Sequence, residues 1–296
     1  MNNRSTPIKD RNQYPKLWFD DGNVVLTTSV SRFRVHRSVL SMSSPVLAGM
    51  LQPDRIRGEE TYEGLPVFEI NDNEVDFMHL LYFIYDRRYY QYGIETTFGK
   101  MSGLLRMSTK YQMHELRSEI IQHLALAYPT TRAQYLKAVD PKAWLPLFPP
   151  FHGQHFAVAA LARQTNATVL LPAALWRSTC MTLKDILDGA VDSNGTKHRL
   201  CPADILRCTI AKSNVYKHII NAETALMNEL RQSECARQDE KEDSIVSPCM
   251  DIATSQFIQY SISSGTVLVR EECDSMTQAA LGSFEVWRLL VCDSCR

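Results

Sequence analysis

The sequence predicts an α+β fold over residues 16–128, followed by a mostly α-helical region over residues 129–296. Residues 24–35 carry the β-branched and alternating patterns that are typical of two short strands. Apolar residues then recur at helical spacing up to residue 124, with one further strand pattern at residues 67–70. After Pro129 few strand signals remain, which favours a second, helical part of the chain.

The strand signals predict a short three-stranded sheet. Residues 24–28 follow the turn formers Asp20 to Asn23, and residues 31–35 alternate polar and apolar side chains, so the two stretches form a hairpin. Residues 67–70 supply the third strand. Residues 1–15 are polar, and we expect them to be a disordered lead-in. They also lack the apolar core of a secretory signal.

Capping residues mark the helices of the first part. Ser44 and Pro45 suit the N-cap and first position of a helix, so two short helices are expected to meet there. Asp72 or Asn73 caps the next helix, and two further helical patterns follow before Pro129. The charged stretch 52–64 is expected to be a surface loop.

The second part carries three helical patterns, at residues 154–165, 172–188 and 202–231. The middle one begins at Pro172 and stops at Gly189. Residues 130–153 contain many aromatic residues and prolines, so we expect a packed connector with its bulky side chains buried. Residues 232–247 are the most polar stretch and are expected to be exposed or disordered.

Composition limits the function classes. The chain has 296 residues, and its 32 Lys and Arg balance 33 Asp and Glu, which argues against a nucleic-acid surface. No apolar run approaches the ~18 to 20 residues that cross a bilayer. We therefore expect an intracellular protein, cytoplasmic or nuclear. All eight cysteines follow residue 148, and they are expected to be thiols or metal ligands sooner than disulfides.

No motif of an enzyme or of a cofactor site stands out. The phosphate-binding glycine loops and the G-x-S-x-G elbow are missing from the sequence, and His114-Glu115 lacks the second histidine of a metalloprotease. His152 and His155 are three residues apart but have no nearby acidic or cysteine companion. We expect no enzyme, no cofactor and no metal. A weak candidate for structural zinc is the thiol set Cys249, Cys292 and Cys295.

Four short stretches of the first part resemble the BTB/POZ family, in its fungal type with a helical C-terminal region. Residues 33–40, Phe-Arg-Val-His-Arg-Ser-Val-Leu, and the following Ser44-Pro45-Val46-Leu47 resemble the core signature of that family. Residues 77–85 resemble its third helix, and residues 104–113 a later one. The resemblance covers residues 16–128. It implies a cluster of helices flanked by a short three-stranded sheet, and a protein-interaction module without catalytic residues.

The resemblance also implies two interaction surfaces. Many family members form homodimers through a polar pocket that joins an acidic residue to the basic residue after the histidine. Here the basic member is Arg37, and the acidic member is Asp20 or Asp21, because Asn23 has no carboxylate. Carried over, this interface consists of Asp21, His36, Arg37, Val39 and Leu40.

The second implied surface binds the cullin scaffold of a ubiquitin ligase, and its residues here are Phe83, Tyr85, Tyr89 and Tyr90. The family's loop motif places an apolar residue two before a Glu, whereas Gly93 stands two before Glu95, so the motif is not met. The leading hypothesis is therefore a protein-interaction scaffold that self-associates or recruits partners. The alternatives are a substrate adaptor of a cullin ligase and, with least support, an enzyme with a site in the C-terminal half.

Overall fold

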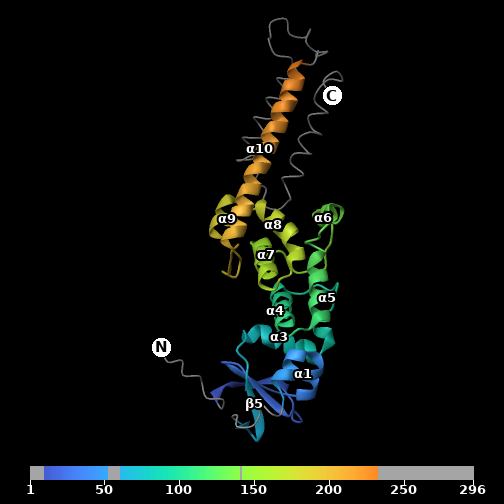
Figure 1. Ribbon diagram of the computed structural model, residues 1–296, viewed down its shortest axis with the longest axis vertical. Helices are drawn as coiled ribbons and strands as arrows, with labels where there is room; N and C mark the ends of the chain where they lie inside the picture. Colours follow the sequence, from blue (N-terminus) through green and yellow to red (C-terminus); the bar gives the residue numbers. More distant parts are fainter. Residues whose placement is uncertain (1–9, 53–60, 141, 233–296) are drawn as a thin grey trace. The chain divides into compact units, whose positions relative to one another are not determined.

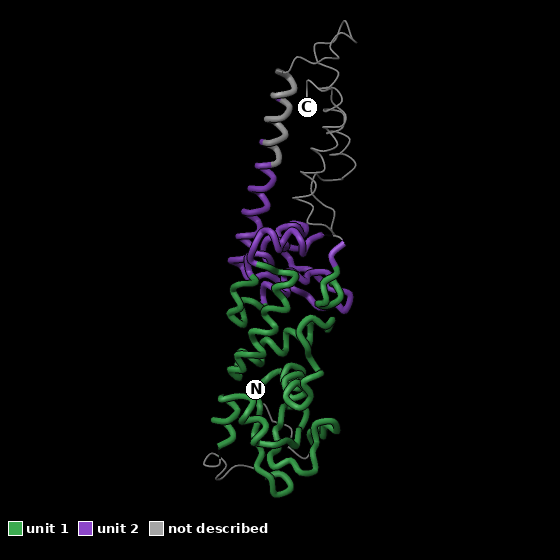
Figure 2. Tube along the Cα trace, turned by 90° about the vertical axis from the view of Figure 1, so that its right-hand side faces the viewer, with its two compact units in different colours: residues 1–129, 144–150, 161–170 green, residues 130–143, 151–160, 171–296 purple. Residues whose placement is uncertain are grey.

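The computed structural model describes residues 10–52, 61–140 and 142–232. The chain divides into two compact units (Figure 2). The first unit consists of residues 1–129, 144–150 and 161–170, and the second consists of residues 130–143, 151–160 and 171–296.

The first unit contains a five-stranded sheet with the order β1-β3-β2-β5-β4. In Figure 1 the sheet is drawn in blue, with β5 labelled. Its centre is the predicted hairpin of β2 (Val24–Thr27) and β3 (Ser31–Val35), in which Leu26 pairs with Phe33. The predicted third strand is β5 (Leu65–Glu69), which runs parallel to β2. Every residue of β2 is buried, so this strand is part of the hydrophobic core.

Two strands lie outside the predicted three. β1 (Asn12–Trp18) pairs in parallel with β3, so residues 12–15 are not a disordered lead-in. Arg11 fastens this strand, because its guanidinium donates a 2.7 Å hydrogen bond to the carbonyl of Thr28 and pairs with Glu69 at 3.3 Å. β4 (Thr61–Tyr62) pairs with β5 inside the stretch that was expected to be a loop.

The two short helices meet at Ser44 as predicted. α1 (Arg37–Ser43) ends there and α2 (Pro45–Met50) begins, with the Ser44 hydroxyl accepting a hydrogen bond from the Leu47 amide at 3.1 Å. The same hydroxyl donates to the carbonyl of Tyr111 at 2.6 Å. One buried serine thus caps a helix and ties it to the end of α4.

Three longer helices complete this part of the unit: α3 (Glu74–Tyr85), α4 (Phe98–Lys110) and α5 (His114–Ala125). Asn73 is the N-cap of α3, since its side chain accepts from the Asp76 amide. Their inward faces bury the apolar residues that the spacing predicts, among them Phe77, Leu80, Leu104, Leu105, Ile120 and Leu124. The core therefore lies between the sheet and these helices.

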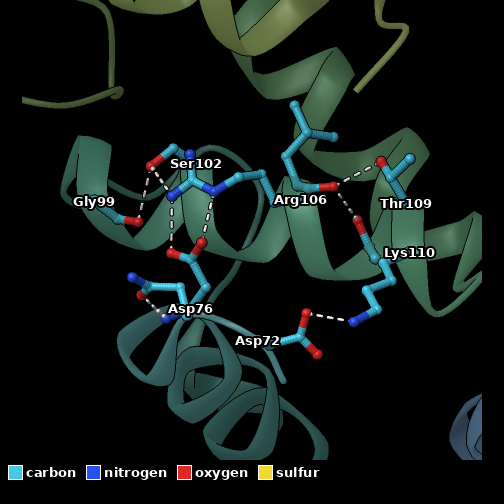
Figure 3. Close-up of polar contacts among 10 residues, drawn as sticks. Asp72, Asp76, Gly99, Ser102, Arg106, Thr109 and Lys110 are labelled. Atoms are coloured by element: carbon cyan, nitrogen blue, oxygen red, sulfur yellow. Dashed lines mark hydrogen bonds and ion pairs between the residues drawn. The ribbon is translucent and has the colours of Figure 1, made fainter. Parts of the chain in front are cut away.

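Charged side chains fasten α3 to α4 (Figure 3). The Arg106 guanidinium donates to both carboxylate oxygens of Asp76, at 2.6 and 2.8 Å. One turn after Arg106 on α4, Lys110 Nζ donates to the Asp72 carboxylate at 2.5 Å, and the Tyr111 hydroxyl donates to the same carboxylate at 2.6 Å. Such two-pronged pairs are geometrically specific, so they fix how the two helices align.

His123 on α5 joins the η3 turn (Arg87–Tyr89) and its following loop to residues 144–150 of the same unit. Its Nε2 lies 2.6 Å from the carbonyl of Pro146, and its Nδ1 lies 2.9 Å from the Tyr90 hydroxyl. A carbonyl only accepts, so Nε2 carries the proton and the Tyr90 hydroxyl donates to Nδ1 in the neutral ring. Phe98 packs edge-on against Phe148 beside this contact, with ring centroids 5.2 Å apart.

The connector 130–153 is only partly packed. It contains the short helix α6 (Arg132–Ala138), which buries no residue, and the side chain of Trp144 is 74% exposed. Leu147 and Phe148 are buried, as expected for this stretch. Burial of all its bulky residues was therefore a wrong expectation.

Helix α7 (Gln154–Gln164) matches the prediction, but the helix predicted at 172–188 is two helices. The short η4 turn (Thr168–Leu170) comes directly before α8 (Leu171–Thr179). A break at residues 180–182 then separates α8 from α9 (Leu183–Asp188). The Thr182 hydroxyl accepts from the Asp185 amide at 3.0 Å and so starts α9.

The second unit also contains a two-stranded ribbon of β6 (Ala190–Val191) and β7 (Lys197–His198), and the long helix α10 (Pro202–Gln232). α10 begins at Pro202 as predicted and packs on α8 and α9. Within the described part of the chain, no helix combines the length and the apolar character that a membrane span needs. The stretch 232–247 beyond its first residue and the thiols Cys249, Cys292 and Cys295 lie outside the described residues.

Candidate protein-interaction surfaces

The first implied surface lies where β3 passes into α1. His36 Nε2 lies 3.1 Å from Asp21 Oδ1, and the backbone amide of His36 donates to the Tyr85 hydroxyl at 2.8 Å. The same hydroxyl lies 3.2 Å from His36 Nδ1. In the neutral ring Tyr85 can therefore donate to Nδ1 while Nε2 donates to Asp21. The hydrogen bond from His36 lowers the pKa of the exposed Asp21 carboxyl.

The carboxylate of Asp21 thus pairs with His36 and not with Arg37. Asn23 has no carboxylate to pair with the Arg37 guanidinium. Its side-chain oxygen instead accepts a hydrogen bond from the backbone amide of Arg37, at 2.8 Å, at the start of α1. The guanidinium of Arg37 forms no ion pair with any of the described residues. A cation at the edge of the fold is thereby left available to a carboxylate from another molecule.

The apolar members of this surface separate into core and surface residues. Leu40 is fully buried and belongs to the core, whereas Val39 is partly exposed. Met42, one turn further on α1, is 88% exposed. Sequence reasoning missed Met42, since a methionine in an apolar helix reads as core. Together with the partly exposed Val46, these residues define what we call the α1–α2 surface: Arg37, Val39, Met42 and Val46.

The second implied surface, at the end of α3, is largely occupied by internal contacts. Phe83 is 2% exposed and lies beneath the Arg87 guanidinium, which stands 4.5 Å from the ring centroid. Tyr90 is 3% exposed, its hydroxyl lies on His123, and burial raises its pKa. Neither side chain offers a surface to a partner without a change of the loop.

Tyr85 and Tyr89 are partly exposed but are also engaged. Phe19 stacks on the Tyr85 ring at 4.6 Å between centroids. The Tyr89 hydroxyl lies 2.5 Å from His79 Nδ1, and Lys100 Nζ lies 4.2 Å above the Tyr89 ring. The Tyr89 contacts join η3 to α3 and α4, and the Tyr85 contact joins the end of α3 to the segment before β2, so both side chains already support the fold.

The loop that follows η3 carries the exposed apolar residues of this region. Tyr92 is 48% and Ile94 is 58% exposed, next to the exposed Glu95. The loop is anchored further on, where the Thr96 amide donates to the carbonyl of Leu147 at 2.8 Å. Sequence reasoning missed Tyr92 and Ile94 because single apolar residues in a loop have no periodicity. We call these two residues the loop tip.

The histidines of the second unit do not assemble a site. His152 contacts Asp185 at 3.5 Å and the carbonyl of Val191, whereas burial and the Arg177 charge lower the pKa of His155 to about 3. His198 pairs instead with Asp192 at 3.0 Å. Across residues 10–52, 61–140 and 142–232, no three His, Cys, Asp or Glu side chains are grouped so as to hold a metal ion.

Comparison with known families assigns residues 19–126 of the first unit. The family model of the BTB/POZ domain matches residues 19–126, which run from just before β2 to the end of α5. The match begins after β1 and ends before α6. Among the curated proteins, none matches the chain.

Proposed function

We propose that this chain, whose residues 19–126 form a BTB/POZ domain, is a scaffold that associates with a second copy of itself through the α1–α2 surface. BTB domains are in general protein-interaction modules and not enzymes, so protein partners are the expected ligands.

The observation that carries it is the 88% exposure of Met42 on α1, the helix whose first residue, Arg37, forms no ion pair with any of the described residues. Met42 is the most exposed of the large apolar side chains in the described part of the chain, at 88%. Exposed methionine at a helix surface is typical of interfaces, where methionine and arginine are enriched. An apolar centre with a charge at its edge is the composition that an interface between two copies needs.

The chemistry suits a two-fold arrangement. In such a dimer the same patch meets itself, so Met42 of one copy can pack against apolar residues of the other. Asp20 and Asp21 are both exposed on the turn that precedes β2, so they offer carboxylates for the partner's Arg37. Arg37 therefore has a complementary group on an identical molecule.

Light scattering over a range of concentrations tests the proposal. We expect twice the chain mass for the wild type, and the mass of one chain for Met42→Glu and for Arg37→Asp. The matched control is Val75→Glu, which changes an apolar residue of α3 that is 53% exposed and is not one of the four residues of the α1–α2 surface. A wild type of single-chain mass at tens of micromolar, or a Met42→Glu variant that remains a dimer, contradicts the proposal.

A second candidate function is that of a substrate adaptor for a cullin-based ubiquitin ligase. The loop tip favours it, because Tyr92 and Ile94 expose apolar surface in the region where the resemblance places the cullin contact. The test is calorimetric titration with the cullin scaffold. We expect Ile94→Asp to abolish binding and Val169→Asp, another exposed residue of the first unit, to leave it unchanged. Phe83→Ala is unsuitable, because it would remove a core residue.

A further inference from the structure

Residues 145–148, which we call the strap, are a short piece of chain that packs on the first unit. They belong to that unit, whereas the segments 130–143 and 151–160, before and after them, belong to the second (Figure 2). The flanks of the strap are little packed. Helix α6 buries no residue, Trp144 is 74% exposed, and two exposed prolines follow the strap. The strap therefore contacts the first unit much as a bound peptide would.

Two backbone carbonyls of the strap are held by donors of the first unit. The Thr96 amide donates to the carbonyl of Leu147 at 2.8 Å, and His123 Nε2 donates to the carbonyl of Pro146 at 2.6 Å. Thr96 lies just before the N-cap of α4, and His123 is a buried residue of α5. Both donors are thus set in place by helices, and they bind the main chain of the strap, as in other peptide-recognition sites.

The side chains of the strap add a sequence preference. Leu147 and Phe148 are 5% and 8% exposed, and the Phe148 ring packs edge-on against that of Phe98 at 5.2 Å between centroids. The Leu147 amide donates to the carbonyl of Leu145 at 2.8 Å, which makes a tight bend at Pro146. Proline already has the backbone φ of such a bend, so ordering it costs little entropy. We call the residues that hold the strap the strap site: Thr96, Phe98 and His123.

We infer that the strap site recognises a segment of a partner protein in which a proline is followed by a leucine and an aromatic residue, and that the strap occupies this site until the partner displaces it. The strap is an imperfect occupant. Thr96 Oγ1 is buried and has no hydrogen-bond partner among the described residues. A buried hydroxyl without a partner is unfavourable, so a segment with a polar group at that point would bind better than the strap.

The loop tip offers a partner a second advantage. Tyr92 and Ile94 remain 48% and 58% exposed while the strap is bound. They are close to the strap site, because the Tyr92 ring lies 5.4 Å from the ring of His123 and Ile94 stands two residues before Thr96. A partner segment that extends beyond the proline motif can cover these side chains as well. It then gains apolar contacts that the strap does not make.

The strap reduces the affinity of any competing peptide. A tethered segment acts at a local concentration on the order of a millimolar, and a ligand loses affinity in proportion to the fraction of molecules whose site is closed. Release of the strap is nevertheless a local event, since its flanks bury little. The inference does not depend on the proposed dimer, because no residue of the α1–α2 surface belongs to the strap site.

Fluorescence anisotropy with a labelled peptide of residues 143–150 tests the inference on the full chain. The double variant Leu147→Ala, Phe148→Ala removes the side chains that hold the strap. We expect the peptide to bind this variant at least tenfold more tightly than the wild type. A peptide with the same two substitutions should bind neither chain. The matched control is Pro149→Ala, Pro150→Ala, which changes exposed residues outside the strap and should behave as the wild type.

Hydrogen exchange of the Thr96 amide locates the bound peptide, because this amide bonds to the strap. In the wild type it should exchange through local opening, at least tenfold faster than the amide of the buried Leu105 in α4. In the double variant it should lose protection, and addition of the peptide should restore it.

Each other outcome overturns the inference. Equal affinity of the peptide for the wild type and the double variant would place the peptide elsewhere. Failure of the peptide to bind the double variant would show that the strap is part of the fold and not a replaceable ligand. A wild-type Thr96 amide that exchanges only together with the amides of α4 would show the same, and this measurement does not require the variant to fold.

Discussion

Gly103 of α4 lies directly against Asp76 of α3. A Cβ atom built on Gly103 would stand 2.7 Å from Asp76 Oδ1, 3.0 Å from His79 Cδ2 and 3.3 Å from Asp76 Cα. The Asp76 carboxylate cannot swing away without breaking its pair with Arg106. The close approach of the two helices and the ion pair between them are therefore one arrangement, and each depends on the other.

Gly103→Ala should destabilise the BTB/POZ domain although alanine favours helices. The added methyl would have to displace the Asp76 carboxylate or part the helices, at a cost of about 1–3 kcal/mol. The gain in helix propensity is at most about 1 kcal/mol. Urea unfolding measures the difference. Gly99→Ala, on the same helix with no atom within 4 Å of its new Cβ, should be neutral or slightly stabilising. Equal effects of the two variants would show that the contact does not constrain the helices.

Arg106→Met should lower the free energy of unfolding by about 2–3 kcal/mol. The substitution leaves the Asp76 carboxylate buried without its partner, and such losses are large for a buried pair but smaller where one side chain is partly exposed. The side chains of Asp76 and Arg106 are 9% and 27% exposed. Hydrogen exchange of the α3 and α4 amides gives the local value.

The control for that substitution is Arg88→Met. The Arg88 guanidinium also donates to both carboxylate oxygens of Asp86, at 3.0 and 3.3 Å, but its side chain is 85% exposed. Surface pairs of this kind contribute about 0–1 kcal/mol. A loss as large for Arg88→Met as for Arg106→Met would contradict the importance that we give to burial.

Local signals made most of the first unit predictable. The hairpin of β2 and β3, and the break between α1 and α2 at Ser44, depend on residues close in sequence. β1 was missed because its partner β3 begins 13 residues after β1 ends, and most of its side chains are polar and exposed. The break between α8 and α9 was also missed, although Thr182 and Asp185 have the spacing of a helix cap.

The interaction surfaces were less predictable, for a physical reason. A sequence pattern shows that a residue is apolar but not whether the fold covers it. Phe83 and Met42 both lie on helices, yet tertiary packing leaves one 2% and the other 88% exposed. The pairing of Asp21 with His36 likewise depends on where the turn before β2 lies relative to α1.

The stability of the second unit should fall as the pH drops from 7 to 4.5. Burial, with the nearby Arg177 charge, lowers the pKa of His155 from 6.5 to about 3, so the folded state holds the neutral ring. Between these two pKa values the unfolded chain binds a proton that the folded chain does not. Stability is therefore complete above pH 6.5 and decreases by up to about 1.4 kcal/mol for each pH unit below it.

Urea unfolding at several pH values, followed through hydrogen exchange of α7 and α8, measures this slope. His155→Gln should flatten it, since the variant has no proton to gain in this range. His218→Gln, which changes an exposed histidine of α10, should leave the slope as in the wild type. A His155→Gln variant with an unchanged slope would mean that other groups cause the acid sensitivity.

Lys212 should be a stabilising residue of the second unit in spite of its charge. It is 5% exposed, and its ammonium donates to the carbonyls of Thr179 and Met181 at 2.9 and 3.0 Å, just where α8 ends. Burial lowers the pKa of Lys212, so the fold bears a cost for keeping the charge there. The favourable interaction of a cation with the end of a helix offsets that cost.

Lys212→Met should therefore lower the free energy of unfolding of the second unit by about 1–3 kcal/mol, because two carbonyls lose their donor. Hydrogen exchange at the end of α8 is the most direct measurement. Lys217→Met, five residues further on the same helix and exposed, should change stability by less than about 0.5 kcal/mol. If Lys212→Met instead proved as stable as the wild type, the apolar contacts of methionine would outweigh the two hydrogen bonds, and the lysine would be dispensable for joining α8 to α10.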